Sequence, residues 1–163
     1  IKLIFEHLAT ACKDGKNLDA RSAMTMAAYY AGLAINQVNV GNVHAIAHQL
    51  GGKYGIPHGL ANSLVLPHIL EFCREEAQQP LADLAVLIGA GNADEDPAAL
   101  AQKFIQAVLD LRTEVGIPDQ MDVIKREDFE AISELAIKEG AAYPVPRLPD
   151  RENVMLILNK ISG

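Results

Sequence analysis

Tryptophan is absent from this 163-residue chain, and aromatic residues of all kinds make up only 5% of it. A core without many large rings must be filled by alanine, leucine, isoleucine and valine, which favours the packing of helix against helix. Cysteine is also scarce, and Cys12 and Cys73 lack the spacing typical of a metal site or a redox pair. We therefore predict two separate, buried thiols in a cytoplasmic protein.

Clustered positive charge and long apolar runs are missing as well. The 14 lysine and arginine residues are scattered and the formal net charge is −7. Nucleic acid is therefore not an expected partner, because phosphate binding requires grouped cations. No apolar run reaches the roughly 18 to 20 residues that a membrane-spanning helix needs, so no membrane partner is expected. No secretory signal is recognisable at the N-terminus.

The apolar residues that are present recur almost throughout at helical spacing, and no segment indicates a strand. Asn17 and Asp150 stand where side chains cap helices. Pro67 predicts a kink or a break in its helix, and three prolines within 143–149 predict an extended segment. We expect one all-α domain over residues 1–163.

The N-terminal residues suggest a chain cut inside a helix. Ile1, Ile4, Phe5 and Leu8 already show helical spacing, and neither an initiator methionine nor a capping residue precedes them. The expectation is that residues 1–163 form a fragment of a longer protein.

Three of the five histidines lie within sixteen residues, 44–59, which read HAIAHQLGGKYGIPHG. His44 and His48 are four residues apart, so a helix places both rings on one face. The glycines at 51, 52 and 55 allow the chain to reverse, and His58 then falls in the first turn of the next helix, facing the first pair. Two or three converging imidazoles predict a site for a divalent metal ion. The alternative is a histidine pair with a purely structural role.

Two other interpretations of this stretch are less favourable. Ala45 follows His44, so the general-base glutamate of the HExxH zinc proteases is missing. The stretch also lacks the glycine-rich pattern that binds nucleotide phosphates and the serine pattern of acyl-enzyme catalysis.

The wider stretch is similar to the signature of the iron-containing (group III) alcohol dehydrogenases, and it reads GNVHAIAHQLGGKYGIPHGLANSLVLPHILEF. The C-terminal residues resemble the end of the same family and read AIKEGAAYPVPRLPDRENVMLILNKI. The resemblance covers essentially the whole chain. It implies the helical C-terminal domain of the dehydroquinate synthase-like fold, and only part of a family member.

The resemblance also implies roles for the three histidines. It makes His44 and His58 metal ligands, for Fe(II) or Zn(II), and makes His48 a proton-transfer residue beside the nicotinamide. Two further family ligands, in an Asp-x-x-x-His pattern, have no counterpart before His44. The domain that binds NAD(P) is missing too, so the chain alone is expected to be inactive. The implied substrates are primary alcohols, diols or aldehydes, and a homo-oligomer is possible.

Two other functions stay open at this level. The chain could be a non-catalytic helical module for metal binding or assembly. It could also hydrolyse a metal-bound substrate, which requires a carboxylate near the histidines, and the nearest acid that follows them is Glu71. Asn62 and Ser63 are interpreted as local hydrogen bonders outside the site. We interpret the segment 142–147 as a break between helices rather than as part of a substrate pocket.

Overall fold

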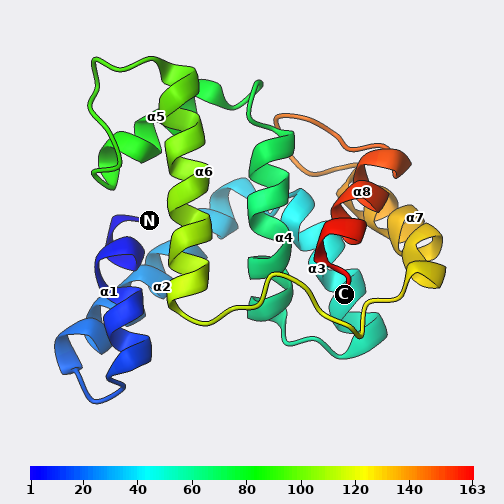
Figure 1. Ribbon diagram of the computed structural model, residues 1–163, viewed down its shortest axis with the longest axis horizontal. Coiled ribbons are helices and arrows are strands. Elements are labelled where there is room, and N and C mark those ends of the chain that lie inside the picture. Colours follow the sequence, from blue (N-terminus) through cyan, green and yellow to red (C-terminus); the bar gives the residue numbers. More distant parts are fainter. The chain divides into compact units, whose positions relative to one another are not determined.

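The computed structural model describes all residues from 1 to 163, and its regular elements are helices (Figure 1). They are α1 (Lys2–Lys13), α2 (Leu18–Val38), α3 (Asn42–Tyr54), α4 (His58–Phe72), α5 (Gln78–Leu87), α6 (Pro97–Glu114), the short 3-10 helix η1 (Arg126–Asp128), α7 (Phe129–Gly140) and α8 (Arg151–Ile161). The only bridge of β type is an isolated one between Met121 and Ser162. The predicted all-α class is confirmed. No helix combines the length and the apolar character that crossing a membrane requires.

The chain divides into two compact units, and the first comprises Ile1–Asn39 and Arg74–Gly116. Within it, α1 packs against α2 and α5 lies along α6 (Figure 1). The rings of Phe5 and Phe104 meet at a centroid distance of 5.9 Å and join α1 to α6. Asn17 caps α2 as predicted, since its side chain accepts a hydrogen bond from the backbone of Ala20.

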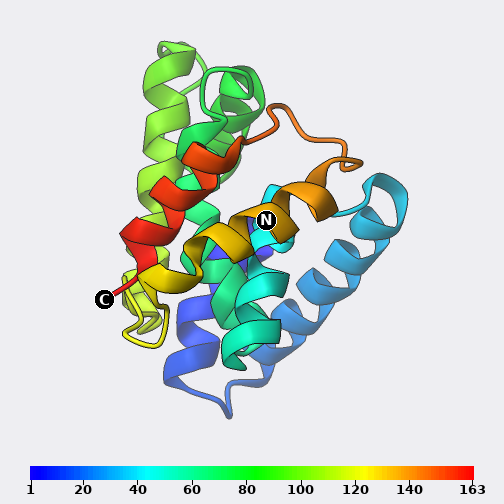
Figure 2. The ribbon, with the colours of Figure 1, turned by 90° about the vertical axis from the view of Figure 1, so that its right-hand side faces the viewer.

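The second unit comprises Val40–Cys73 and Ile117–Gly163, and it contains all three residues of the histidine motif. Helix α3 packs against both α4 and α7, while α8 covers α7 and touches α4 (Figure 2). Fully buried aliphatic side chains from these helices form the core: Leu50, Leu64, Ile132, Leu158 and Ile161. Asp150 caps α8 as predicted, here in a reciprocal capping box with Asn153.

The non-helical segment between α7 and α8 is tied to the neighbouring helices. Asn42, in the first turn of α3, donates a hydrogen bond from Nδ2 to the carbonyl oxygen of Arg147 at 2.8 Å. The Arg147 guanidinium lies 4.3 Å from the centroid of the Phe72 ring and donates to the Phe72 carbonyl. The proline-rich segment is therefore an ordered strap across the second unit.

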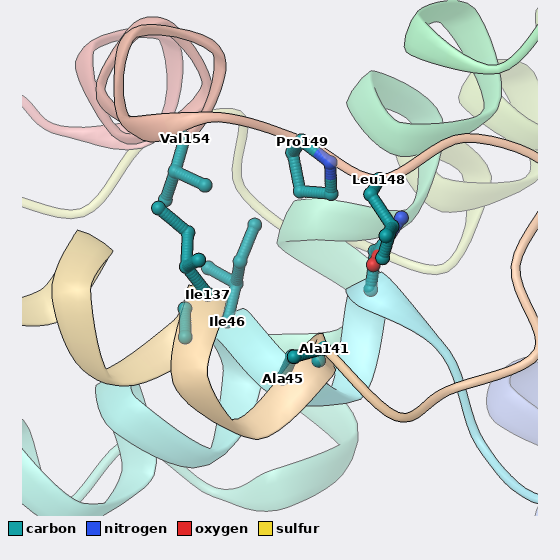
Figure 3. A pocket seen from close by; sticks show the side chains of 10 residues that line it. Ala45, Ile46, Ile137, Ala141, Leu148, Pro149 and Val154 are labelled. Atoms are coloured by element: carbon teal, nitrogen blue, oxygen red, sulfur yellow. The ribbon is translucent and has the colours of Figure 1, made fainter.

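A small apolar cavity of about 80 Å³ lies beneath this strap. Figure 3 shows Ala45 and Ile46 of α3, Ile137 of α7 and Val154 of α8 around it, with Leu148 and Pro149 of the strap above. Its lining is nearly all aliphatic and includes none of the histidines. The cavity is therefore separate from the site described below.

Three local expectations need correction. Helix α4 runs through the buried Pro67, so the expected break is absent, while a kink at this proline stays a prediction. Helix α3 continues through Gly51 and Gly52, so Gly55 alone ends it. Cys12 and Cys73 form no disulfide, as predicted, but Cys12 is exposed, because α1 buries none of its residues completely.

Candidate functional site

The turn between α3 and α4 brings the histidine motif together. Gly55 ends α3 in the left-handed conformation, with φ at +68°, a conformation that glycine adopts without steric cost. Ile56 is then buried and anchors the turn. Pro57 precedes α4 as its N-cap, so His58 is the first helical residue. The chain reverses over three residues, and His58 returns to the face of α3 that carries His44 and His48.

The three imidazole rings converge as the spacing predicted. The ring centroids of His44 and His58 are 5.3 Å apart, those of His48 and His58 5.4 Å, and those of His44 and His48 5.7 Å. Two imidazoles that bind one tetrahedral ion through nitrogen at about 2 Å place their ring centres roughly 5 Å apart. The spacing of the rings therefore suits ligation of a single divalent ion.

Spacing alone does not complete a metal site. No group of three or more histidine, cysteine, aspartate or glutamate side chains in residues 1–163 is arranged to hold an ion. The three rings lie close together, but the Nδ1 atom of His48 is turned toward a carboxylate of α7. The three rings alone therefore do not make up a complete metal site.

His44 is the most enclosed of the three histidines, and its environment favours the neutral form of the ring. Burial lowers its pKa below the usual 6.5, and the neighbouring rings of His58 and His48 lower it further when they are charged. Glu139 acts in the opposite direction but does not reverse the shift. A neutral imidazole retains the lone pair that a metal ion requires.

His58 has a hydrogen-bonding partner one helical turn along α4. The Nδ2 atom of Asn62 lies 3.1 Å from Nε2 of His58 and 2.8 Å from the His58 carbonyl oxygen. The carbonyl can only accept, so the amide group must present its N–H donors to both atoms. In the neutral ring, Nε2 of His58 is therefore the acceptor and Nδ1 carries the proton. Asn62 is a local hydrogen bonder, as expected, but it also touches the candidate site.

His48 is held by Glu139, a residue that the sequence analysis did not identify. Nδ1 of His48 lies 2.6 Å from Oε1 of Glu139, 91 positions away in the chain. The same oxygen accepts a hydrogen bond from the Tyr143 hydroxyl at 2.9 Å, and Oε2 accepts one from Nε2 of Gln49 at 2.7 Å. The only hint in the sequence was the position of Glu139 in the C-terminal stretch that resembles the family.

The environment of Glu139 favours its charged form. Burial alone would raise its pKa, but the hydrogen bonds from His48, Tyr143 and Gln49 outweigh burial, and the pKa lies below the usual 4.5. The carboxylate that metal-assisted hydrolysis would need is thus present near the histidines. Its two oxygens already face three hydrogen-bonding groups, on His48, Tyr143 and Gln49.

Tyr143 changes the interpretation of the proline-rich segment. This residue belongs to the strap, and its hydroxyl reaches the histidine cluster through Glu139. The segment 142–147 therefore does more than separate α7 from α8, because it contributes one of the three hydrogen bonds to that carboxylate.

The chain is similar to known proteins over nearly its whole length. The family model described as "Fe-containing alcohol dehydrogenase family, C-terminal" matches residues 1–162. The chain is 38% identical over 162 residues to 1,3-propanediol dehydrogenase of Klebsiella pneumoniae, which covers 98% of this chain and 42% of that protein. It is also 38% identical over 164 residues to alcohol dehydrogenase 4 of Saccharomyces cerevisiae (strain YJM789), covering 98% and 41% respectively.

The fold agrees with the sequence matches. The crystal structure of a 1,3-propanediol oxidoreductase superposes with a TM-score of 0.92 at 38% identity, over 97% of this chain and 42% of the other. The chain thus spans well under half the length of the relatives that it matches.

Proposed function

Because the chain belongs to the iron-containing alcohol dehydrogenase family and corresponds to its C-terminal domain, we propose that His44 and His58 are two ligands of a divalent metal ion. The remaining ligands would come from outside residues 1–163. Imidazole suits both Fe(II) and Zn(II), and intrinsic affinity favours zinc over iron.

The proposal rests mainly on the short distance between the His44 and His58 rings, whose centroids are 5.3 Å apart. The third ring, that of His48, lies beside them and contacts the carboxylate of Glu139. The lowered pKa of His44 keeps its lone pair available, and Asn62 leaves Nε2 of His58 as an unprotonated nitrogen in the neutral ring. His48 differs from both because Glu139 engages its Nδ1 atom.

The three histidines divide the work of alcohol oxidation between binding and proton transfer. When bound, a divalent ion supplies a Lewis acid for the substrate oxygen, and the nicotinamide accepts the hydride. His48 stands within one helical turn of His44 and is 41% exposed at its side chain, so it can exchange a proton with a substrate or with water. Imidazole is the side chain most often used as a general acid or base in catalysis, which suits this role.

For the whole protein, we propose reversible, NAD(P)-linked oxidation of a primary alcohol or diol to the aldehyde. The relatives named 1,3-propanediol dehydrogenase and alcohol dehydrogenase support this substrate class. Residues 1–163 carry no recognisable dinucleotide-binding pattern. We expect the 163-residue polypeptide alone to show no dehydrogenase activity, and we expect the whole protein to self-associate.

The first experiment is a metal measurement on the 163-residue chain. The polypeptide is purified without a metal-chelating column, its metal content is determined by mass spectrometry, and Zn(II) and Fe(II) are titrated into it. We expect weak binding of one ion, because two imidazoles cannot complete a coordination shell. Tight binding of one ion by the isolated chain would contradict the two-ligand proposal.

Variants assign the three roles. His44→Ala and His58→Ala should each abolish the residual zinc binding, whereas His48→Ala should leave it largely unchanged. Loss of zinc binding in His48→Ala would make this residue a ligand, since a metal-bound histidine commonly donates its other N–H to a carboxylate. His7→Ala serves as the matched control, because His7 lies on α1 in the other unit.

A further inference from the structure

We infer that Glu139 is a positioning residue that fixes His48 in the tautomer with its proton on Nδ1, so that Nε2 is the atom that accepts a proton. The importance of this atom for alcohol oxidation rests on the function proposed above. The hydrogen-bonding arrangement itself does not depend on metal, cofactor or activity, and it can be measured separately.

The assignment follows from the hydrogen-bonding capacity of a carboxylate. An ionised carboxylate can only accept hydrogen bonds, and the lowered pKa of Glu139 indicates that it is ionised. The contact of 2.6 Å between Oε1 and Nδ1 of His48 therefore requires a proton on Nδ1. In a neutral ring the lone pair must then lie on Nε2.

Two further donors hold the carboxylate in place. The Tyr143 hydroxyl donates to Oε1 at 2.9 Å, and Gln49 donates from Nε2 to Oε2 at 2.7 Å. Gln49 also donates from the same nitrogen to the carbonyl oxygen of Ala45 at 3.1 Å, which fixes which end of its amide faces Glu139. Both oxygens of Glu139 are thus restrained independently of His48.

The packing of α3 on α7 makes the arrangement rigid. Small residues lie where these helices meet: Ala45 of α3 is 3% exposed and Ala136 of α7 is 3% exposed. Their size lets the helix backbones approach closely. Glu139 follows Ala136 by three positions on α7, and His48 follows Ala45 by three positions on α3, so both project from the same helix contact.

In the proposed reaction, this tautomer lets His48 accept the hydroxyl proton of the alcohol. The O–H bond of an alcohol breaks as an N–H bond forms at Nε2 of His48, and the ring becomes a cation. The negative charge of Glu139, 2.6 Å from Nδ1, stabilises that cation without taking the proton itself. The proton can then leave to water, because His48 is partly exposed.

Nuclear magnetic resonance of the 163-residue chain labelled with ¹⁵N tests the inference directly. Long-range proton–nitrogen correlations of the imidazole rings report which nitrogen carries the proton, and they are recorded at a pH where the rings are neutral. We expect Nδ1–H for His48 in the original sequence. Glu139→Ala should abolish this preference and give a mixture of tautomers, whereas Glu139→Gln retains an acceptor oxygen and should keep the preference.

Controls separate positioning from folding. Glu134→Ala removes another carboxylate from the same helix, one that is 62% exposed and lies 3.7 Å from Arg151, and it should leave the His48 spectrum unchanged. Circular dichroism and the ring signals of His7 establish that each variant is folded.

Three results would overturn the inference: a proton on Nε2 of His48 in the original sequence, an unchanged spectrum in folded Glu139→Ala, or loss of the preference in Glu139→Gln. None of them bears on whether His44 and His58 bind metal. Conversely, a chain that binds one zinc ion tightly and shows the Nδ1–H tautomer would contradict the two-ligand proposal and leave the role of Glu139 intact.

Discussion

Removal of the Asn62 side chain should strengthen metal binding. Its Nδ2 atom donates a hydrogen bond to Nε2 of His58 at 3.1 Å. A metal ion that binds through this nitrogen must first displace the amide. Asn62→Ala removes the competing hydrogen bond, and the ring nitrogen is then free before the ion arrives.

The size of the effect follows from the value of one hydrogen bond. Intramolecular hydrogen bonds contribute about 0.5 to 1.5 kcal/mol net, and the exposed position of His58 places this one in the lower half of that range. A difference of about 0.5 to 1 kcal/mol corresponds to roughly two- to fivefold in a dissociation constant. The variant should also fold normally, because Oδ1 of Asn62 is buried without a hydrogen-bonding partner and its removal relieves that cost.

The assay is competition for Zn(II) against a chromogenic chelator at constant pH and ionic strength. Ser63→Ala is the matched control, because Ser63 makes an equivalent bond from Oγ to the Gly59 carbonyl at 2.8 Å but does not touch the ring. Unchanged or weaker zinc binding in Asn62→Ala would refute the reasoning. It would mean that the ion uses Nδ1 of His58 or that Asn62 supports the ring in its binding orientation.

Three further expectations concern the framework of the second unit. Ile46→Ala removes a side chain that is 1% exposed beside the apolar cavity and should lower the free energy of unfolding by about 2 to 5 kcal/mol in urea denaturation; a loss below that range would indicate that the cavity walls collapse. Asp150→Ala breaks the capping box of α8 and should cost about 1 kcal/mol, with no change in zinc affinity. Hydrogen bonds from Lys53 and Tyr54 lower the pKa of Asp128 below the usual 3.8. The stability that these bonds give the folded protein is therefore fully present above pH 3.8 and is lost as the pH falls through the lowered pKa of Asp128. Asp128→Asn should therefore be less stable than the original sequence at pH 7, and the difference should shrink as the pH falls below 3.8; a difference independent of pH would contradict this account.

The helical framework could be predicted from the sequence because its causes are local. Asn17 and Asp150 cap helices through bonds to backbone groups three residues away, and both were identifiable from residue type and position. The absence of helix over 143–149 follows from the prolines, whose rings disfavour a helix interior. Where local rules failed, packing had intervened: α4 continues through Pro67 because the ring is buried in the core.

By itself, the sequence determined the class of the fold, the convergence of His44, His48 and His58, and the resemblance to a metal-dependent family. The fold class depends on helical periodicity, and the resemblance depends on short motifs. The convergence of the histidines depends on a turn at Gly55, within a stretch of sixteen residues. The tertiary structure alone decided which partner each ring contacts. Glu139 reaches His48 from 91 positions away because α7 packs on α3, and Tyr143 in turn donates a hydrogen bond to Glu139. No local pattern encodes a contact between such distant segments. That contact occupies one ring nitrogen of His48 and distinguishes it from His44, although the two histidines lie on the same helix.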